Sequence, residues 1–339
     1  MGRLRVLRIG ANATVQDLGR PGYLAVGLSR GGAADRLAIL EGAAILGNDL
    51  GCAAIELPMG SARFQATEPC QIAVTGADVT VDIDGANVAG YQSLFLNKNH
   101  ILTVGSARAG VYAYLHVGGG IRSREWMGSR SAHLAARIGA AIAEGDILPV
   151  RPKSGSTSPA IKLAPAPRLA GGMVRLLRTA QTGYFSDETC QRFVATTFLR
   201  SARGNRQGVL LECDREKFTA SNQLSLASEV VQPGDIQLTG DGVPYILGPE
   251  CQTTGGYPRI ATVHPDDLPI VAQTAPGAAL RFHFVDVEPI RQQLRDPAIQ
   301  LKELASRLEP ALRDPREMSD LLGYQLISGV EEPGGGEEP

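Results

Sequence analysis

Two glycine-rich turns in the first half of the chain carry charged and hydroxyl groups that suit the binding of a small carbonyl or carboxylate compound. Asp17 and Arg20 lie three residues apart in a loop bounded by glycine and proline. Ser129 and Arg130 follow Gly128, and the fixed charge of Arg130 suits a carboxylate or carbonyl oxygen. We therefore expect Arg130 to take part in catalysis, and Asp17, Arg20 and Ser129 to contact the substrate.

A third turn, residues 252–258, combines an amide, two hydroxyls and two glycines that expose backbone N–H groups. Such a loop can bind an amide substrate or stabilise an oxyanion. A hairpin held by threonine side chains accounts for the same residues equally well. In this turn we assign catalysis to Gln252, Thr253 and Thr254, and substrate binding to Gly255, Gly256 and Tyr257.

Ser29 lies in a G-x-S-x-G pattern at residues 27–31, which is the pattern of a nucleophile elbow. The surrounding chain lacks the alternating strands and helices of the hydrolase fold in which that elbow occurs. An HGGG-like segment at residues 116–120 follows the serine, whereas the oxyanion segment of those enzymes precedes it. The pattern therefore favours a glycine-rich entry to a helix over a catalytic Ser29.

Metal, nucleotide and biotin motifs are missing from the sequence. The five histidines and five cysteines show none of the spacings of metal ligands, and no phosphate-binding glycine motif follows a strand. No Ala-Met-Lys-Met-like biotin attachment site occurs. We therefore predict no metal site and no covalently bound cofactor.

Alternation of apolar and polar residues, which is typical of half-buried strands, dominates the chain. Predicted strands include residues 79–83, 111–117 and 281–287, and a hairpin of 236–238 with 245–247 around Asp241-Gly242. Predicted helices span Ala33–Leu46, a segment that Ser186 begins, residues 264 to about 273, and Pro289 to Leu308 with a break at Pro297.

Strands without regularly intervening helices argue against a doubly wound α/β fold and favour a mainly β protein of two closed or nearly closed barrels. Residues 151–171 are rich in proline, serine and alanine and are interpreted as a linker. The predicted organisation is a barrel at 1–150, that linker, a barrel at 172–288, a helical extension at 289–330 and a disordered acidic tail at 331–339.

The chain has 339 residues and a formal charge of −2, so it lacks a dominant electrostatic attraction to nucleic acids or anionic membranes. No apolar run approaches the roughly 18 residues of a membrane-spanning helix, and the first residues lack the apolar core of a signal peptide. Five cysteines without a C-x-x-C pair fit reduced thiols. We expect a cytoplasmic protein that binds neither nucleic acid nor membrane.

Seven sequence motifs, which follow one another along the chain, are similar to those of a known protein family. They are QDLGRPGY (16–23), GLSRGGAADRLA (27–38), GN with AAIEL (47–57), GGGI with GSRS (118–131), EGDIL (144–148), GDIQLTGDGVPYIL (234–247) and QTTGGYPRIATV (252–263). On these motifs the chain resembles the allophanate hydrolase subunit 2 family, also called the KipA or biotin-dependent carboxyltransferase family. The resemblance covers about residues 4–287.

The resemblance implies tandem cyclophilin-like β-barrels and a KipI-like partner subunit. In bacterial 5-oxoprolinase the similar chain is the C subunit, which works with a KipI-like subunit and a LamB/YcsF-like subunit to open 5-oxoproline to glutamate at the expense of ATP. We therefore expect a subunit that acts on a small amide or lactam.

Two alternatives remain open. The chain could be the carboxyltransferase half of a biotin-dependent urea or amide carboxylase, with carboxybiotin on a separate carrier, or a non-catalytic regulatory subunit of a KipI-like partner. It also departs from its relatives, because Pro249-Glu250-Cys251 replaces Ala-Asp-Arg before the QTTGG motif, and Arg-Ser-Arg at 122–124 replaces Asp-Val-Pro. These departures change the charge beside the candidate site.

Overall fold

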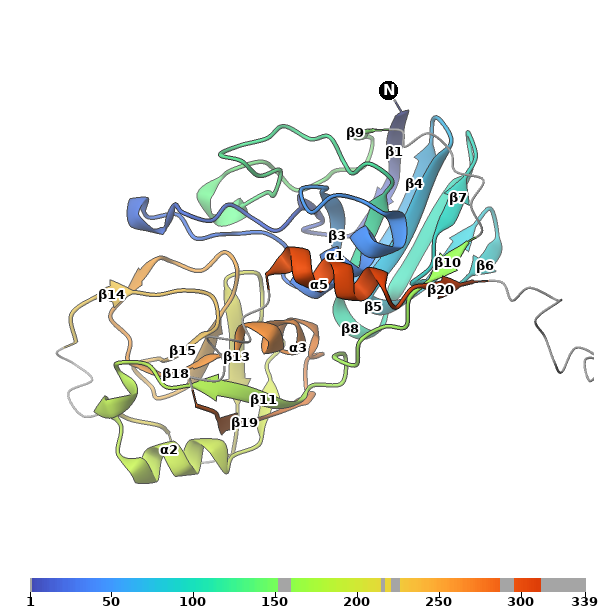
Figure 1. Cartoon of the computed structure of the whole chain (residues 1–339). Helices are drawn as coiled ribbons and strands as arrows, with labels where there is room; N and C mark the ends of the chain where they lie inside the picture. The colour runs from blue at the N-terminus through green and yellow to red at the C-terminus, as the bar shows by residue number, and fades with distance from the viewer. Residues whose placement is uncertain (1, 152–159, 215–216, 221–225, 287–295, 312–339) are drawn as a thin grey trace, which may run out of the picture.

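The computed structural model describes residues 2–151, 160–214, 217–220, 226–286 and 296–311. Figure 1 shows two groups of strands side by side, the first built from the N-terminal half of the chain and the second from residue 172 onward. Strands predominate in both groups, which confirms the mainly β prediction. No helix among these residues is long and apolar enough to cross a membrane.

The first domain is one nine-stranded sheet. Its strands are β1 (Gly2–Ile9), β2 (Thr14–Gln16), β3 (Ala54–Pro58), β4 (Gly60–Ala66), β5 (Cys70–Ile83), β6 (Ala86–Val88), β7 (Leu94–Leu96), β8 (Ile101–Val117) and β9 (Ile147–Val150). The order is β2-β3-β8-β4-β1-β9, and β5 pairs with β6, β7 and β8. Among the described residues, only the isolated bridges of Ile121 to Ala53, before β3, and to Val150 of β9 connect the two sides of this sheet, so this domain is a half-barrel and not a closed barrel.

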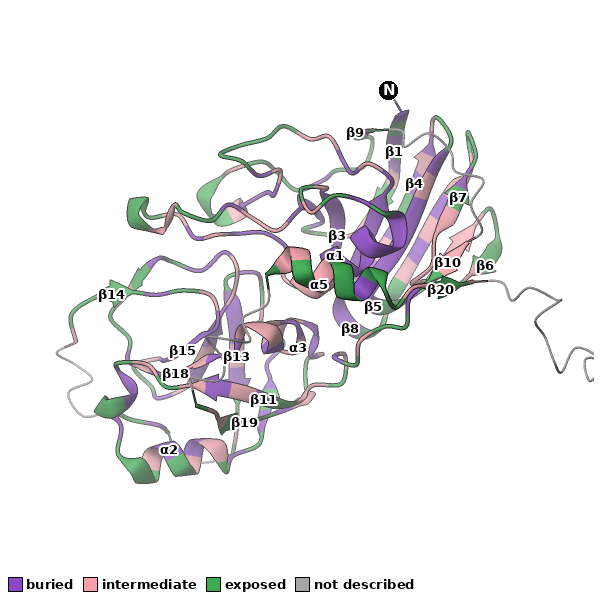
Figure 2. Cartoon of the chain, viewed as in Figure 1, coloured by how far each residue is buried: buried purple, intermediate pink, exposed green. Residues whose placement is uncertain are grey.

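The expected strands at 79–83 and 111–117 are confirmed as parts of the much longer β5 and β8. The helix α1 (Arg36–Leu46) begins three residues later than predicted. The Asp35 carboxylate accepts a hydrogen bond from the Ala38 N–H at 3.1 Å, and Gly47 ends the helix at a φ of 56°. Figure 2 shows α1 buried on nearly all sides, which its apolar sequence allows.

The second domain is a closed barrel of seven strands in the order β11-β18-β15-β16-β13-β12-β19. These strands are β11 (Gly172–Leu177), β12 (Phe198–Arg200), β13 (Gly208–Glu212), β15 (Asp235–Leu238), β16 (Pro244–Leu247), β18 (Arg259–Val263) and β19 (Ala279–Phe284). The predicted hairpin is confirmed as the antiparallel pair β15 and β16. The closure depends on β11 and β19, which lie parallel to each other. A separate ribbon joins β14 (Glu229–Val230) to β17 (Thr254–Gly255).

Two predicted helices of the second domain are confirmed. Ser186 caps α2 (Asp187–Val194), since its hydroxyl accepts the Thr189 N–H at 3.1 Å. The α3 helix (Leu268–Gln273) follows the 3₁₀ turn η4 (Pro265–Asp267). Further 3₁₀ turns are η1 (Leu24–Val26), η2 (Leu134–Ala136) and η3 (Thr182–Tyr184).

The described part of the expected linker is packed against the first domain. Within it, β10 (Ile161–Lys162) pairs with β20 (Glu309–Pro310), and Leu163 is buried in an apolar cluster with Leu304 of α5 (Pro297–Ala305). Figure 1 shows α5 lying against α1. The α5 helix begins at the proline where we predicted a break. The remainder of the expected extension at 289–295 and 312–330, and the tail at 331–339, lie outside the described residues.

Gln273, at the end of α3, ties the two domains together. Its Oε1 accepts the backbone N–H groups of Val111 and Tyr112 at 2.8 and 3.0 Å. Its Nε2 donates to the Tyr112 carbonyl at 2.8 Å and to the Asp35 carboxylate at 2.9 Å. A fully buried amide with this many partners fixes the relative position of α3 and β8.

Candidate functional site

Asp17 is the centre of the contact between the first two candidate turns. Its Oδ1 accepts hydrogen bonds from the hydroxyls of Ser129 and Ser131 at 2.6 and 2.5 Å, and its Oδ2 accepts the Arg130 N–H at 2.7 Å. The structure therefore brings Asp17, Ser129 and Arg130 together, although they lie more than 110 residues apart in sequence. Because both carboxylate oxygens bind protein donors, Asp17 shapes the 128–131 turn.

The two arginines of these turns, Arg20 and Arg130, differ in the hydrogen bonds that their guanidinium groups make. The Arg130 guanidinium donates to the Ser123 carbonyl and to Glu125 at 3.1 Å, so it holds its own loop. Arg20 is almost fully buried, donates to the Ser131 carbonyl, and leaves its Nη1 without a partner among the described residues. Arg20 therefore has one N–H donor without a partner among the described residues. Arg130 does not border the cavity described below.

The 252–257 turn lies in the second domain and takes the form of a ribbon. Thr254 pairs with Val230, and the Gln252 amide donates to Gln237 Oε1 at 3.1 Å. The Thr253 carbonyl accepts the Val231 N–H at 2.9 Å. In the part of the chain that the structure describes, no hydrogen bond is made by the hydroxyls of Thr253 and Thr254, which are therefore open to a ligand.

The segment before this turn docks on the first domain and brings the candidate turns to one junction. The Pro249 carbonyl accepts the Gly31 N–H at 3.0 Å, and Glu250 Oε2 accepts the Ala135 N–H at 3.1 Å. A Cβ at Gly27 would lie 4.0 Å from Thr253 Oγ1. The 24–28 loop and the 252–257 turn are therefore neighbours across the domain boundary.

An ion-pair network closes the same junction. Arg206, from the second domain, donates from Nη1 to Glu56 of the first domain and from Nε to Glu250 Oε1 at 2.5 Å. The Tyr114 hydroxyl donates to Glu56 Oε2 at 2.7 Å. All four side chains are buried. Burial disfavours the charge of Arg206, but the carboxylates of Glu56 and Glu250 outweigh it and raise the pKa of Arg206.

Ser29 and His133 meet at this junction, with Ser29 Oγ 2.8 Å from His133 Nε2. His133 Nδ1 accepts the Ala136 N–H at 3.1 Å, and Glu250 Oε2 lies 3.8 Å from the same nitrogen. Burial lowers the pKa of His133, so the ring is neutral near pH 7. Because Nδ1 is an acceptor, the proton of the neutral ring is on Nε2, which donates to Ser29. This tautomer cannot act as the base for a Ser29 nucleophile.

Ser29→Ala is therefore expected to change the kcat of the active complex by less than about threefold, whereas removal of a true serine nucleophile costs roughly a million-fold. The substitution leaves the Nε2 proton of His133 without an acceptor, so we expect a loss of about 1 kcal/mol in the free energy of unfolding. Steady-state kinetics and thermal unfolding measure both effects. A fall in kcat of more than about a hundredfold at unchanged stability would restore Ser29 as a nucleophile.

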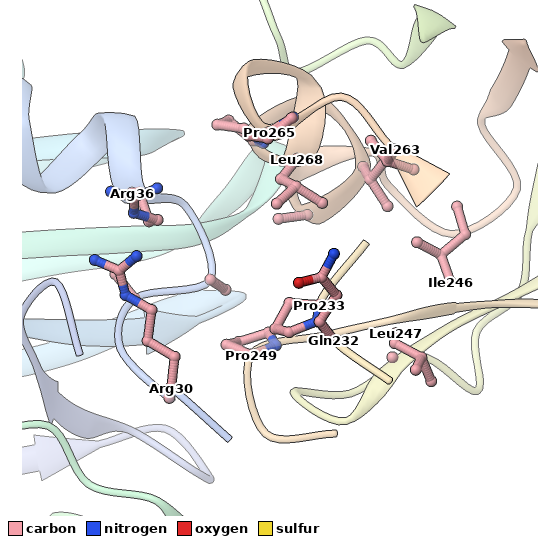
Figure 3. A pocket seen from close by; sticks show the side chains of 18 of the residues that line it. Arg30, Arg36, Gln232, Pro233, Ile246, Leu247, Pro249, Val263, Pro265 and Leu268 are labelled. Atoms are coloured by element: carbon pink, nitrogen blue, oxygen red, sulfur yellow. The ribbon is translucent and has the colours of Figure 1, made fainter. Parts of the chain in front are cut away.

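A cavity of about 540 Å³ lies between the two domains, beside the junction. Its first-domain lining includes Arg20, Tyr23, Leu28, Arg30, Arg36 and Tyr112, and its second-domain lining includes Arg200, Gln232, Ile246, Leu247, Val263 and Leu268. Figure 3 shows Arg30 and Arg36 next to each other on one side, with Ile246, Leu247, Val263 and Leu268 on the other. Arg36, Arg200 and Gln232 could not be predicted as site residues from the sequence, because they come from separate segments and form no motif.

The fold and the cavity define a class of protein: two β domains with a preformed small-molecule pocket at their junction. The chain belongs to the family whose model is described as the carboxyltransferase domain, subdomains A and B, which matches residues 26–284. The family resemblance of the motifs is thereby confirmed.

Three relatives place the chain within this family. It is 30% identical to the C subunit of 5-oxoprolinase from Haemophilus influenzae over 303 residues, which cover 88% of this chain and 96% of that protein. It is also 30% identical to the C subunit of 5-oxoprolinase from Escherichia coli over 309 residues, covering 90% and 98%. The crystal structure of the K. lactis urea amidolyase superposes with a TM-score of 0.80 at 25% identity, covering 92% of this chain and 21% of that one. The chain thus spans nearly all of both 5-oxoprolinase subunits but about a fifth of the urea amidolyase.

Proposed function

We propose that this chain is one subunit of an enzyme that acts on a small amide or lactam, and that the enzyme is an ATP-dependent 5-oxoprolinase that opens 5-oxoproline to glutamate. The observation that carries the proposal is the similarity to the C subunits of two 5-oxoprolinases over nearly the whole length of each chain. In this proposal the complex uses ATP in the cytoplasm, and this chain holds no covalent cofactor.

The proposed partners are a KipI-like subunit and a LamB/YcsF-like subunit. Support comes from the names of the two relatives, since a lettered subunit implies further subunits. The loops around the junction also expose large apolar side chains, including Val26 at 77% and Tyr257 at 51%. Apolar side chains this exposed are suited to contact with a partner protein.

Within the proposal, the open hydroxyls of Thr253 and Thr254 and the amide of Gln252 contact the reacting carbonyl group. Gly255, Gly256 and Tyr257 contact the substrate, and Arg20 supplies its unused N–H donor. Asp17, Ser129 and Arg130 position the loops, because their polar groups bind one another or their own loop.

Carboxyl transfer from carboxybiotin on a separate carrier to urea or a related amide is the second candidate. The description of the family and the similarity to urea amidolyase favour it. A regulatory subunit without turnover is the third. Both alternatives keep the KipI-like partner and change the chemistry of the complex.

Reconstitution separates these three functions. The chain is purified with its neighbouring KipI-like and LamB/YcsF-like proteins, and 5-oxoproline-dependent release of phosphate and glutamate is measured. We expect activity that is lost when this chain is omitted. The control replaces 5-oxoproline with urea, bicarbonate and a biotin carrier. Turnover of urea and not of 5-oxoproline would establish carboxyl transfer. Turnover of 5-oxoproline by the partner proteins without this chain would indicate that the chain is regulatory.

A further inference from the structure

Three arginines beside the interdomain cavity have buried nitrogen atoms without hydrogen-bond partners among the described residues. They are Nη1 of Arg20, Nε of Arg36 and Nε of Arg200. Arg200 is only 3% exposed, and the described residues provide no acceptor for its Nε. Unpaired donors on buried charged groups are rare in native proteins because each one destabilises the fold. Three at one cavity therefore call for an acceptor from beyond the described residues.

The charged side chains among the described residues that line the cavity are all positive. Arg20, Arg30, Arg36 and Arg200 all border it, and no aspartate or glutamate is among the described residues that line it. Burial, together with the charge of Arg30, lowers the pKa of Arg36 to about 10, and Asp266 offsets this only in part. Burial also lowers the pKa of Arg200. An anion in the cavity would relieve both effects.

The opposite wall of the cavity is apolar. Ile246, Leu247, Val263 and Leu268 form it, and the Gln232 amide lies between this wall and the arginines (Figure 3). The volume of about 540 Å³ is typical of a site for a small organic molecule. Guanidinium groups bind planar carboxylates well, and aliphatic side chains bind the remainder of such a ligand by burying its carbon atoms.

We propose that this cavity binds a small organic carboxylate, with the carboxylate held by arginine donors that border the cavity and have no partner among the described residues, and the carbon skeleton packed on the second barrel. The assignment of the ligand rests on the proposed function: 5-oxoproline is a carboxylate with an aliphatic ring, whereas urea is neutral. None of residues 252–257 lines this cavity, so the cavity holds the substrate beside, and not at, the proposed reaction site, and its arginines select an acid over a neutral amide.

Calorimetric titration of the full chain tests the site. We expect 5-oxoproline to bind, and its neutral carboxamide and urea to bind at least tenfold more weakly. Arg36→Gln and Arg200→Gln are each expected to weaken 5-oxoproline binding at least tenfold, while Arg281→Gln, an exposed control on β19, leaves it unchanged. Equal binding of acid and carboxamide would overturn the proposal. Inorganic phosphate that binds more tightly than 5-oxoproline, and depends on the same arginines, would replace the carboxylate with a phosphate.

Thermal unfolding gives a second readout that a structural role of Arg36 would not produce. Because the Nε of Arg36 has no partner among the described residues, Arg36→Gln is expected to raise the melting temperature of the ligand-free chain and to abolish the further increase that 5-oxoproline causes in the wild type. A lower melting temperature would contradict the proposal. If the chain binds 5-oxoproline through Arg36 but the reconstituted complex is inactive, only the proposed function is refuted. If complexes that carry either arginine variant turn over 5-oxoproline with the KM of the wild type, only this site is refuted.

Discussion

Arg206→Leu is expected to lower the free energy of unfolding by about 4 kcal/mol and to abolish the activity of the reconstituted complex. Arg206 crosses from the second domain to Glu56 of the first and also binds Glu250. Without it, two buried carboxylates lose their cation, and the segment that carries Glu250 loses a contact to the junction. The substitution should therefore damage both stability and the position of the 252–257 turn.

Denaturant unfolding and turnover of the same preparations measure these effects. Arg203→Leu is the matched control, because Arg203 is exposed in the same loop, and it should change neither. Combining Arg206→Leu with Glu56→Gln and Glu250→Gln removes the uncompensated charges and should recover a large part of the stability. A single variant as stable as the wild type would show that the network does not join the domains.

Arg168→Leu is expected to have an effect of similar size, about 4 kcal/mol near pH 8, that becomes smaller at acidic pH. Arg168 lies in the segment that we interpreted as a linker, and its guanidinium binds Asp35 Oδ2 at 2.7 Å and Glu41 Oε2 at 2.6 Å. Both carboxylates are fully buried. The arginine therefore anchors residues 160–171 to α1.

The pH dependence follows from Glu41. Burial raises the pKa of Glu41 and Arg168 offsets part of that shift, so removal of Arg168 raises it further. An acid with a raised pKa in the folded state contributes stability below its unfolded pKa and loses it as the pH rises through the folded value. The deficit of the variant should therefore be smaller at pH 5 than at pH 8.

Denaturant unfolding at the two pH values tests this prediction. Arg108→Leu serves as the control, since Arg108 pairs with Asp78 on the exposed surface and its removal should leave the unfolding curves unchanged at both. A deficit in Arg168→Leu that is equal at pH 5 and pH 8 would contradict the prediction, because it would mean that removal of Arg168 does not change the protonation of Glu41 in the folded state.

Local elements could be predicted because their signals lie within a few residues. Ser186 followed by Asp187 marks the start of α2, and Gly47 marks the end of α1. The hairpin of β15 and β16 follows from alternation on both sides of Asp241-Gly242. The lengths of β5 and β8 and the parallel closure of β11 with β19 could not be predicted, because they depend on which distant strand supplies the hydrogen-bond partners.

The chemical groups of the candidate site could be predicted from the sequence, but the hydrogen-bond partners of those groups could not. Asp17 and Ser129 were expected to contact a substrate, yet they bind each other across 112 residues of sequence. Ser29 matches a nucleophile pattern, yet its partner His133 is a donor in this structure. Residue types determine which hydrogen bonds a side chain can make, but only the neighbours determine which of them remain free.

By itself, the sequence determined the mainly β class, the capped helices, the family and the glycine-rich turns, because each is encoded in residue types at short spacing. Only the tertiary structure decided how the two domains meet. Among the described residues, that junction pairs Arg206 with two carboxylates and leaves the Nε atoms of Arg36 and Arg200 without an acceptor beside one cavity. An arginine either joins parts of the structure through ion pairs or keeps a free N–H donor, and the partners that the fold places beside it decide which.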